Sequence, residues 1–223
     1  MRVAIVGAGA MGLRVAEELL ASSPAVELLA IDASRESLLK FEDALANDRV
    51  KSTLGDATDT GRLAAALQGS DVVVNSAQYD VNVFVMRAAL KAGAHYADLG
   101  GMFHETRRQL KLNDEFYAAG LTAVVGMGAA PGITNILAAH ACADLEQVES
   151  VEASFGAGVE DHGGASQFAP PYSLRTIMQE FLEESVQFIN GSHQSQPPMS
   201  GTREINFPHP IGALDCIYTL HSE

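Results

Sequence analysis

The first 32 residues constrain the fold more than any other part of the chain. Val3–Val6 is a short apolar run rich in β-branched residues, which is typical of a buried parallel strand. It leads directly into the glycine-rich stretch Gly7–Gly12, and a helical pattern follows up to Ser22. A second apolar run ends at Asp32, twenty residues after Gly12. This strand–turn–helix–strand order predicts the beginning of an α/β domain.

The glycine spacing in this unit favours a dinucleotide site. Gly7 permits a tight turn, Gly9 lets the backbone approach a pyrophosphate, and Gly12 lets the helix pack closely on the sheet. Asp32 is placed to accept hydrogen bonds from adenosine ribose hydroxyls. The alternative is a glycine turn that binds no nucleotide, and the correctly spaced acid argues against it. We predict that the cofactor is bound by Gly7, Gly9, Ala10, Met11, Gly12, Asp32, Ala33, Ser34 and Arg35.

The residues after the second strand bear on the choice between NAD and NADP. The carboxylate of Asp32 would repel a 2′-phosphate, which favours NAD. Ser34 and Arg35 are placed where a phosphate-binding pair could lie, although Arg35 could equally be a solvated residue at the start of a helix. We expect NAD as the cofactor, with NADP as the alternative.

Strand and helix patterns alternate through the first 128 residues. Helical segments are predicted at 35–45, 62–67, about 81–92 and 103–119. They separate six short apolar strands at 3–6, 26–31, 50–54, 71–75, 95–99 and 121–125. Two halves of three strands predict a Rossmann fold, a doubly wound parallel sheet in the order 3-2-1-4-5-6.

Ligands of such sheets bind at the carboxyl ends of the strands. Asp56 and Ala57 follow the third strand and are expected beside the adenine, although Asp56 could instead, or also, cap the next helix. Ser76 and Ala77 follow the fourth strand, at the point where the strand order switches. The segment 99–101 follows the fifth strand and belongs to the same edge.

The pattern changes after Gly128, and we expect a dinucleotide domain at 1–130 followed by an α+β domain at 131–223. The second domain is predicted to contain a helix at 131–144 and a strand at 148–156. A glycine- and proline-containing loop follows, then a helix capped by Ser173. A hairpin at 186–189 turns at Asn190-Gly191, and a last strand covers 203–207.

Charge and cysteine content exclude several classes of function. The net charge of −14 argues against nucleic acid or an anionic membrane as a partner. No apolar stretch approaches the length that spans a membrane. Cys142 and Cys216 lie far apart and no histidine pair has ligand spacing, so no metal site is expected. Two cysteines without a disulfide framework are typical of a cytoplasmic protein.

Five blocks of the sequence together resemble the saccharopine dehydrogenase-like family, which includes saccharopine reductase, carboxynorspermidine dehydrogenase and lysine 6-dehydrogenase. The blocks are 7–12, 71–76 with Tyr79, 95–101, 128–135 and 218–223. The resemblance implies an NAD(P)-dependent oxidoreductase that moves a hydride between a nicotinamide and a carbon bearing an amino or imino nitrogen. It implies further that the nicotinamide end is lined by Ala77, Leu99, Gly100 and Ala129, and that Gly100 and Gly101 contact the substrate.

Two departures from the family pattern refine this expectation. Saccharopine and carboxynorspermidine enzymes carry an aspartate where this chain has Ala130, so the chain is more similar to lysine 6-dehydrogenases. The family's chains also run further than Glu223, and we expect the second domain to be incomplete. The expected substrate is a small amino acid such as lysine or saccharopine, and an apolar second domain favours a homodimer.

Oxidation of an amine by hydride transfer also needs a group that accepts the ammonium proton. The catalytic candidates are Asp98, Tyr79 and His104, each with a structural alternative. Asp98 could cap the next helix or bind the Gly-Gly turn, Tyr79 could be a core aromatic, and His104 could be solvated. Three residues of the second domain could close over the substrate, namely His162, Tyr172 and His221. A protein that binds NAD as a sensor or scaffold, without turnover, is the alternative function.

Overall fold

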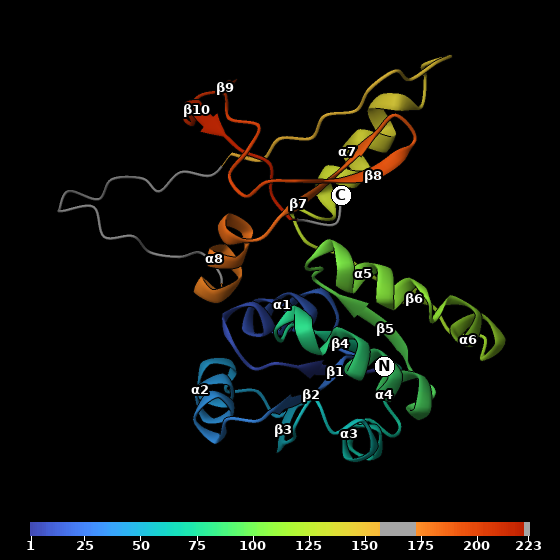
Figure 1. Cartoon of the computed structure of the whole chain (residues 1–223). Coiled ribbons are helices and arrows are strands. Elements are labelled where there is room, and N and C mark those ends of the chain that lie inside the picture. Colours follow the sequence, from blue (N-terminus) through green and yellow to red (C-terminus); the bar gives the residue numbers. More distant parts are fainter. Residues whose placement is uncertain (157–172, 221–223) are drawn as a thin grey trace. The chain divides into compact units, whose positions relative to one another are not determined.

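The computed structural model describes residues 1–156 and 173–220, and the chain forms two compact units, Met1–Gly128 and Ala129–Glu223. The first unit is built on one six-stranded sheet in the order β3-β2-β1-β4-β5-β6 (Figure 1). All neighbouring strands in it are parallel, which confirms the predicted Rossmann order. The strands are β1 Arg2–Val6, β2 Glu27–Asp32, β3 Val50–Leu54, β4 Val72–Asn75, β5 His95–Asp98 and β6 Ala123–Val124.

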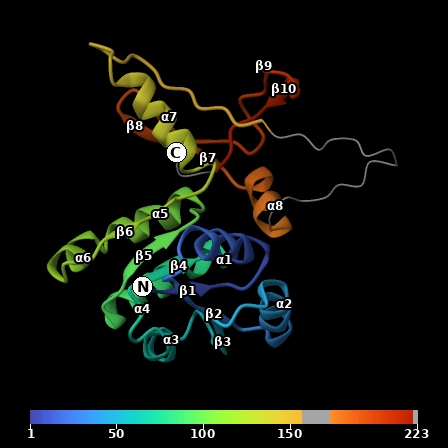
Figure 2. The ribbon, with the colours of Figure 1, turned by 180° about the vertical axis from the view of Figure 1, so that it is seen from behind.

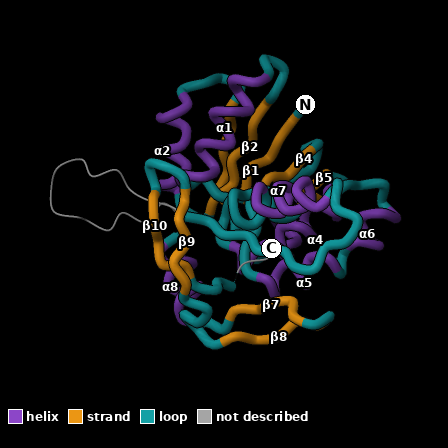
Figure 3. The backbone as a smooth tube through the Cα atoms, turned by 90° about the horizontal axis from the view of Figure 1, so that it is seen from above, coloured by secondary structure: helices purple, strands orange, loops and turns teal. Residues whose placement is uncertain are grey.

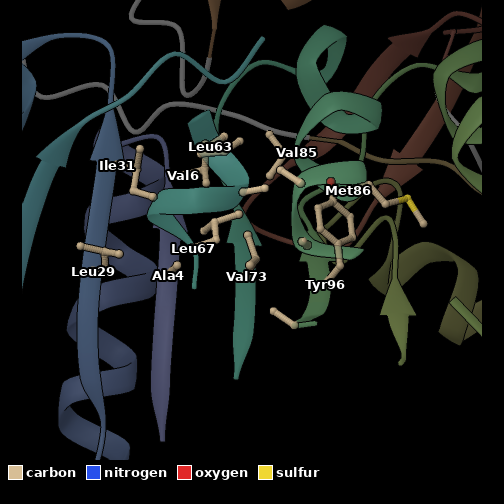
Figure 4. Packing of buried hydrophobic residues seen from close by; sticks show 14 of the residues in the cluster. Ala4, Val6, Leu29, Ile31, Leu63, Leu67, Val73, Val85, Met86 and Tyr96 are labelled. Atoms are coloured by element: carbon tan, nitrogen blue, oxygen red, sulfur yellow. The ribbon is translucent and has the colours of Figure 1, made fainter. Parts of the chain in front are cut away.

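Helices cover both faces of this sheet. The helices α1 Ala10–Ser22 and α2 Arg35–Leu45 pack on one face (Figure 2), where Ala16 and Phe41 meet the buried side chain of Ile5. The helices α3 Thr60–Ala66 and α4 Asn82–Ala92 pack on the other face. Figure 4 shows side chains of that second layer, and those labelled run from Leu29 on β2 to Tyr96 on β5. The sheet is therefore buried on both faces, as its apolar strands predict.

A single helix predicted at 103–119 is divided into two in the structure. The helix α5 Phe103–Leu110 ends in a turn in which Leu112 N–H donates to the Gln109 carbonyl, and α6 Asn113–Ala118 follows. The turn allows Leu112 and Phe116 to be buried in the layer beside β5. Burial of these two side chains therefore sets the direction of the chain here, although the sequence pattern is continuous.

The described residues of the second unit form two helices and two separate hairpins, and Figure 3 shows the strands of these hairpins in orange. The helices are α7 Ile133–Cys142 and α8 Leu174–Leu182, and Ser173 caps α8 as predicted, accepting from the N–H of Thr176. The hairpin of β7 Ser185–Ile189 and β8 Ser192–Gln196 turns at the predicted Asn190-Gly191, both with positive φ. The second hairpin pairs β9 Arg203–Phe207 with β10 Gly212–Cys216.

Two expectations for the second unit were wrong. The strand expected at 148–156 is irregular, because its alternating apolar residues have no neighbouring strand in the described part of the chain. Val148, Val151 and Phe155 are each more than 40% exposed. The strand β10 was missed, since its five residues carry little alternation and it forms by pairing with β9. The predicted loop at 156–171 lies outside the described residues, apart from Gly156.

The described helices include none long and apolar enough to cross a membrane.

Candidate functional site

The glycine-rich turn between β1 and α1 is closely packed except at its centre. Gly7 has φ +100°, and a Cβ there would lie 2.7 Å from the backbone N of Ala77. A Cβ on Gly12 would overlap the carbonyl oxygen of Gly7 and lie 2.8 Å from Ser76 Oγ. A Cβ on Gly9 would meet nothing within 4 Å. Gly7 and Gly12 are therefore required by the fold, whereas the space over Gly9 is open to a ligand.

The first turn of α1 offers N–H groups to that open space. Its N-cap residue is Gly9, which has no side chain to accept a hydrogen bond from the helix. The described first turn contains no acidic side chain either. A helix N-terminus without a capping or acidic side chain can bind an anion through its free N–H groups and the helix dipole. A pyrophosphate is such an anion.

Asp32 joins the end of β2 to the glycine-rich turn. Its Oδ2 accepts from Ala8 N–H at 2.7 Å, and its Oδ1 accepts from Ser34 N–H at 2.7 Å. An ionised carboxylate has about four lone-pair positions, so these bonds leave capacity for ribose hydroxyls. The carboxylate is half-buried and fixed by the backbone before any ligand binds.

The adenosine end of the predicted site is exposed. Ser34 caps α2 by accepting from Ser37 N–H at 3.2 Å, and Arg35 follows as the first, exposed residue of that helix. Asp56 accepts from the hydroxyl and the N–H of Thr58, and these two bonds lower the pKa of Asp56 below its usual value. The cap of α3 is Asp59 rather than Asp56, which corrects the sequence-based alternative.

The loops after β4 and β5 form the other side of the site. Ser76 Oγ donates to the Gly7 carbonyl at 2.9 Å, which ties the β4 loop to the glycine-rich turn. Gly101 lies against Tyr79, whose Cβ a side chain at position 101 would overlap. The first unit thus brings together Gly9, Asp32, Ser76, Ala77 and the 99–101 turn at the carboxyl edge of the sheet.

The three catalytic candidates of the first unit differ in accessibility. Asp98 is 1% exposed, and its oxygens accept from Gly100 N–H, Gly126 N–H and Gln109 Nε2. This arrangement favours a role for Asp98 in binding the Gly-Gly turn over a role as proton acceptor. Tyr79 is buried, as a core aromatic would be. The side chain of His104 is half exposed, and its Nε2 lies 3.9 Å from Glu105 Oε1.

Several predicted residues lie outside this unit or outside the described residues. Ala129 begins the second unit, and Tyr172, His162 and His221 lie in the parts of the chain that are not described. Within residues 1–156 and 173–220, no group of three or more His, Cys, Asp or Glu side chains could hold a metal ion.

Four residues that lie at or behind the carboxyl edge of the sheet were not predicted as site residues, namely Asn75, Asn82, Gln109 and Gly126. Asn82 is a buried polar side chain on α4, which otherwise buries apolar residues, and Asn75 ends the apolar run of β4. Gln109 is buried on α5, whose other buried residue is Glu105. For Asn75 and Asn82 the available sequence signal was a polar residue within an otherwise apolar pattern, and Gln109 carries no such signal. Gly126, which donates to Asp98, carries no such signal, since glycines commonly end strands.

The fold and the glycine-rich turn define a dinucleotide-binding domain of the Rossmann class. Residues 3–124 match the family described as the saccharopine dehydrogenase NADP binding domain, and the chain belongs to this family. The match confirms the family predicted from the sequence and supports a nicotinamide dinucleotide as the cofactor.

Curated relatives are similar over almost the whole chain. Carboxyaminopropylagmatine dehydrogenase from a Synechocystis strain is 28% identical over 100% of this chain and 57% of its own length. Carboxynorspermidine synthase from Vibrio cholerae is 27% identical over 93% of this chain and 55% of its own length. The chain thus spans about half the length of the curated relatives that it matches.

A solved structure supports the fold of the whole chain. Apo saccharopine dehydrogenase (L-Glu forming) from Saccharomyces cerevisiae has a TM-score of 0.70 and 18% sequence identity. The alignment covers 98% of this chain and 49% of the yeast chain. At this identity the similarity establishes the fold alone.

Proposed function

We propose that the chain carries the cofactor domain of an NADP(H)-dependent oxidoreductase that acts at a carbon–nitrogen bond of an amine-bearing amino acid. The observation that carries the proposal is the hydrogen bond between Asp32 and Ala8 N–H, which fixes the carboxylate beside the open space over Gly9. A bound nicotinamide would supply the hydride. The protein's contribution is to hold it in place and to exclude competing reactions.

NADP(H) is the proposed form of the cofactor, in place of the NAD expected from the sequence. The family description names NADP, and Arg35 offers a cation beside Ser34 at the start of α2. NAD(H) is the second candidate, and the carboxylate of Asp32 favours it because that charge would repel a 2′-phosphate. The two bonds that Asp32 accepts from the backbone fix its position and leave its charge in place, so the choice of NADP(H) depends on the cation of Arg35.

Each part of the proposed site has a defined role. The space over Gly9 and the N-terminus of α1 bind the pyrophosphate, and Asp32 accepts from the one free hydroxyl of the adenosine ribose of NADP(H), the 3′-hydroxyl. The loops that contain Ala77 and Gly100 hold the nicotinamide end. The buried Asp98 orients the turn after β5 and takes no proton from the substrate.

The substrate class is proposed from the relatives and from charge. The names carboxyaminopropylagmatine and carboxynorspermidine denote amine-rich compounds that also carry a carboxyl group. An acidic chain with a net charge of −14 attracts cationic amines over distance. We therefore propose such carboxylated polyamines as substrates in addition to lysine and saccharopine, which were expected from the sequence. The predicted homodimer and cytoplasmic location stay predictions.

The proposal is tested by combining a binding measurement with a turnover measurement on the purified chain. Titration with NADPH should show saturable binding, and NADP⁺ reduction should follow addition of one of carboxynorspermidine, lysine or saccharopine. Binding without turnover of any of these amines, both in this chain and in a version extended to the length of its relatives, would contradict the dehydrogenase and favour the sensor. Absence of binding would contradict both.

A further inference from the structure

A line of four buried polar side chains crosses the interior behind the carboxyl edge of β4 and β5. Asn75 Nδ2 donates to Asn82 Oδ1 at 2.7 Å, and Asn82 Nδ2 donates to Gln109 Oε1 at 3.3 Å. Gln109 Nε2 donates to Asp98 Oδ2 at 2.5 Å. None of the four residues is more than 1% exposed. We refer to these four residues, Asn75, Asn82, Gln109 and Asp98, as the amide chain.

The two ends of the amide chain hold three loops. At one end, Asn75 Oδ1 accepts from Ala77 N–H at 3.2 Å, in the loop after β4. At the other end, Asp98 Oδ1 accepts from Gly100 N–H at 2.8 Å and from Gly126 N–H at 2.9 Å. Gly100 and Gly126 belong to the loops after β5 and β6. One connected set of hydrogen bonds therefore positions all three loops of the second half of the sheet.

The direction of the amide chain is fixed by Asp98. An ionised carboxylate only accepts hydrogen bonds, so Gln109 must present its NH₂ group to Asp98 and its oxygen to Asn82. Asn82 must then present its oxygen to Asn75, and Asn75 is left with its oxygen facing Ala77 N–H. A change in hydrogen-bonding character at position 98 is therefore transmitted to the loop at position 77.

We propose that the amide chain is a positioning device for the nicotinamide half of the cofactor site, separate from the groups that bind the adenosine half. The proposal rests on the proposed function, because it assumes that the dinucleotide extends from Asp32 towards Ala77 and Gly100. In a doubly wound sheet the strands β4 to β6 form the half beyond the switch point, and their loops face the second part of the dinucleotide. The adenosine half instead meets the glycine-rich turn and β2, and the side-chain hydrogen bonds of the amide chain described above run to neither of them.

The substitution Asp98→Asn distinguishes the nicotinamide half of the cofactor site from the adenosine half. The new amide must either turn its NH₂ group towards the N–H groups of Gly100 and Gly126 or present it to Gln109. In the second case every amide reverses, and Asn75 presents its own NH₂ group to Ala77 N–H. Either way, at least one loop loses its hydrogen bond, although the side-chain volume is nearly unchanged.

The test compares the dissociation constants of NADPH and of 2′,5′-ADP, which contains only the adenosine half of NADP. We expect Asp98→Asn to raise the Kd of NADPH about tenfold and to leave that of 2′,5′-ADP within about twofold, which corresponds to about 1.4 kcal/mol on one half. The fluorescence increase of NADPH on binding should also fall, because the nicotinamide is held less firmly. Asp71→Asn is the matched control, since Asp71 accepts from Arg2 N–H at the opposite edge of the sheet.

The outcomes separate the two proposals. Failure of the unmodified chain to bind either ligand contradicts the proposed function. Equal weakening of both ligands by Asp98→Asn, or no weakening of NADPH, overturns the positioning role while leaving the cofactor domain standing. Gln109→Met provides a second variant that removes the middle of the amide chain without adding charge. It should show the same split between the two ligands if Asp98→Asn does not fold.

Discussion

The backbone N–H of Ala8 donates a 2.7 Å hydrogen bond to Oδ2 of Asp32, and this bond joins the glycine-rich turn to the end of the neighbouring strand. The two residues are 24 positions apart in sequence. This single hydrogen bond fixes two parts of the expected site. One is the carboxylate that is expected to bind the ribose, and the other is the turn that is expected to bind the pyrophosphate.

Replacing Asp32 should therefore affect folding as well as binding. In Asp32→Ala, the partly buried N–H of Ala8 and the exposed N–H of Ser34 lose their acceptor, and we expect the free energy of unfolding to fall by about 1–3 kcal/mol, chiefly through Ala8. Urea unfolding followed by circular dichroism measures this change. Asp56→Ala is the control, because that exposed carboxylate bonds only to Thr58, and it should change stability by about 0.5 kcal/mol or less. Equal effects of the two substitutions would contradict the bridging role of Asp32.

Gly9 and Gly12 should respond differently to the same substitution. Gly12→Ala forces a Cβ into the backbone of Gly7, so we expect a clear loss of stability. Gly9→Ala places a Cβ in open space and should leave the unfolding midpoint nearly unchanged. It should still weaken NADPH binding by about tenfold or more, because the Cβ lies where the pyrophosphate approaches. Thermal unfolding and NADPH titration of both variants distinguish the two effects, and unchanged NADPH affinity in Gly9→Ala would place the pyrophosphate elsewhere.

Tyr96 should make stability sensitive to alkaline pH. Burial, and next the charge of Asp98, raise the pKa of Tyr96 well above its usual value of about 10. Above about pH 10 the unfolded chain loses the phenol proton while the folded chain keeps it, so the free energy of unfolding decreases as the pH rises. Below that pH the contribution of this group is constant.

The measurement is urea unfolding at about pH 9 and about pH 11 for the unmodified chain, Tyr96→Phe and Tyr117→Phe. Tyr96→Phe should lose less stability between these pH values than the unmodified chain does. Tyr117 is 85% exposed, and its removal should leave the difference unchanged. An identical alkaline loss in Tyr96→Phe and the unmodified chain would show that Tyr96 ionises alike in both states.

Much of the fold followed from local patterns, because parallel strands buried on both faces carry continuous apolar runs. The six strands, their order and the turn at Gly7–Gly12 were predicted from such runs and from spacing. The turn between α5 and α6 was not predicted, because it depends on burial of Leu112 and Phe116 against residues distant in sequence. The strand β10 was missed for the same reason, since its partner β9 defines it.

The candidate site was predicted less completely than the fold. The glycine spacing and Asp32 form a local signature, so the adenosine and pyrophosphate side could be described from the sequence. The amide chain could not, because Asn75, Asn82 and Gln109 meet only after β4, α4 and α5 have packed. Asp98 was expected either to accept a proton or to bind the Gly-Gly turn, and its burial and its three donors favour the second role.

Arg35 should determine the preference for the 2′-phosphate. We expect Arg35→Gln to raise the Kd of NADPH about tenfold while leaving that of NADH within about twofold, since a charge-assisted contact to phosphate is lost. Lys40→Gln removes an exposed positive charge one turn further along α2 and should affect both ligands little. Equal weakening by the two substitutions would indicate a general charge effect instead of a phosphate contact.

The central claim is tested most directly by titrating the unmodified chain with NADPH and, separately, with NADH under the same conditions. We expect saturable binding of both ligands, with NADPH bound about tenfold more tightly or better, because the positive charge of Arg35 favours the 2′-phosphate. Tighter binding of NADH would contradict the proposed cofactor choice and restore the preference implied by Asp32. The absence of binding by either nucleotide would contradict the cofactor domain itself.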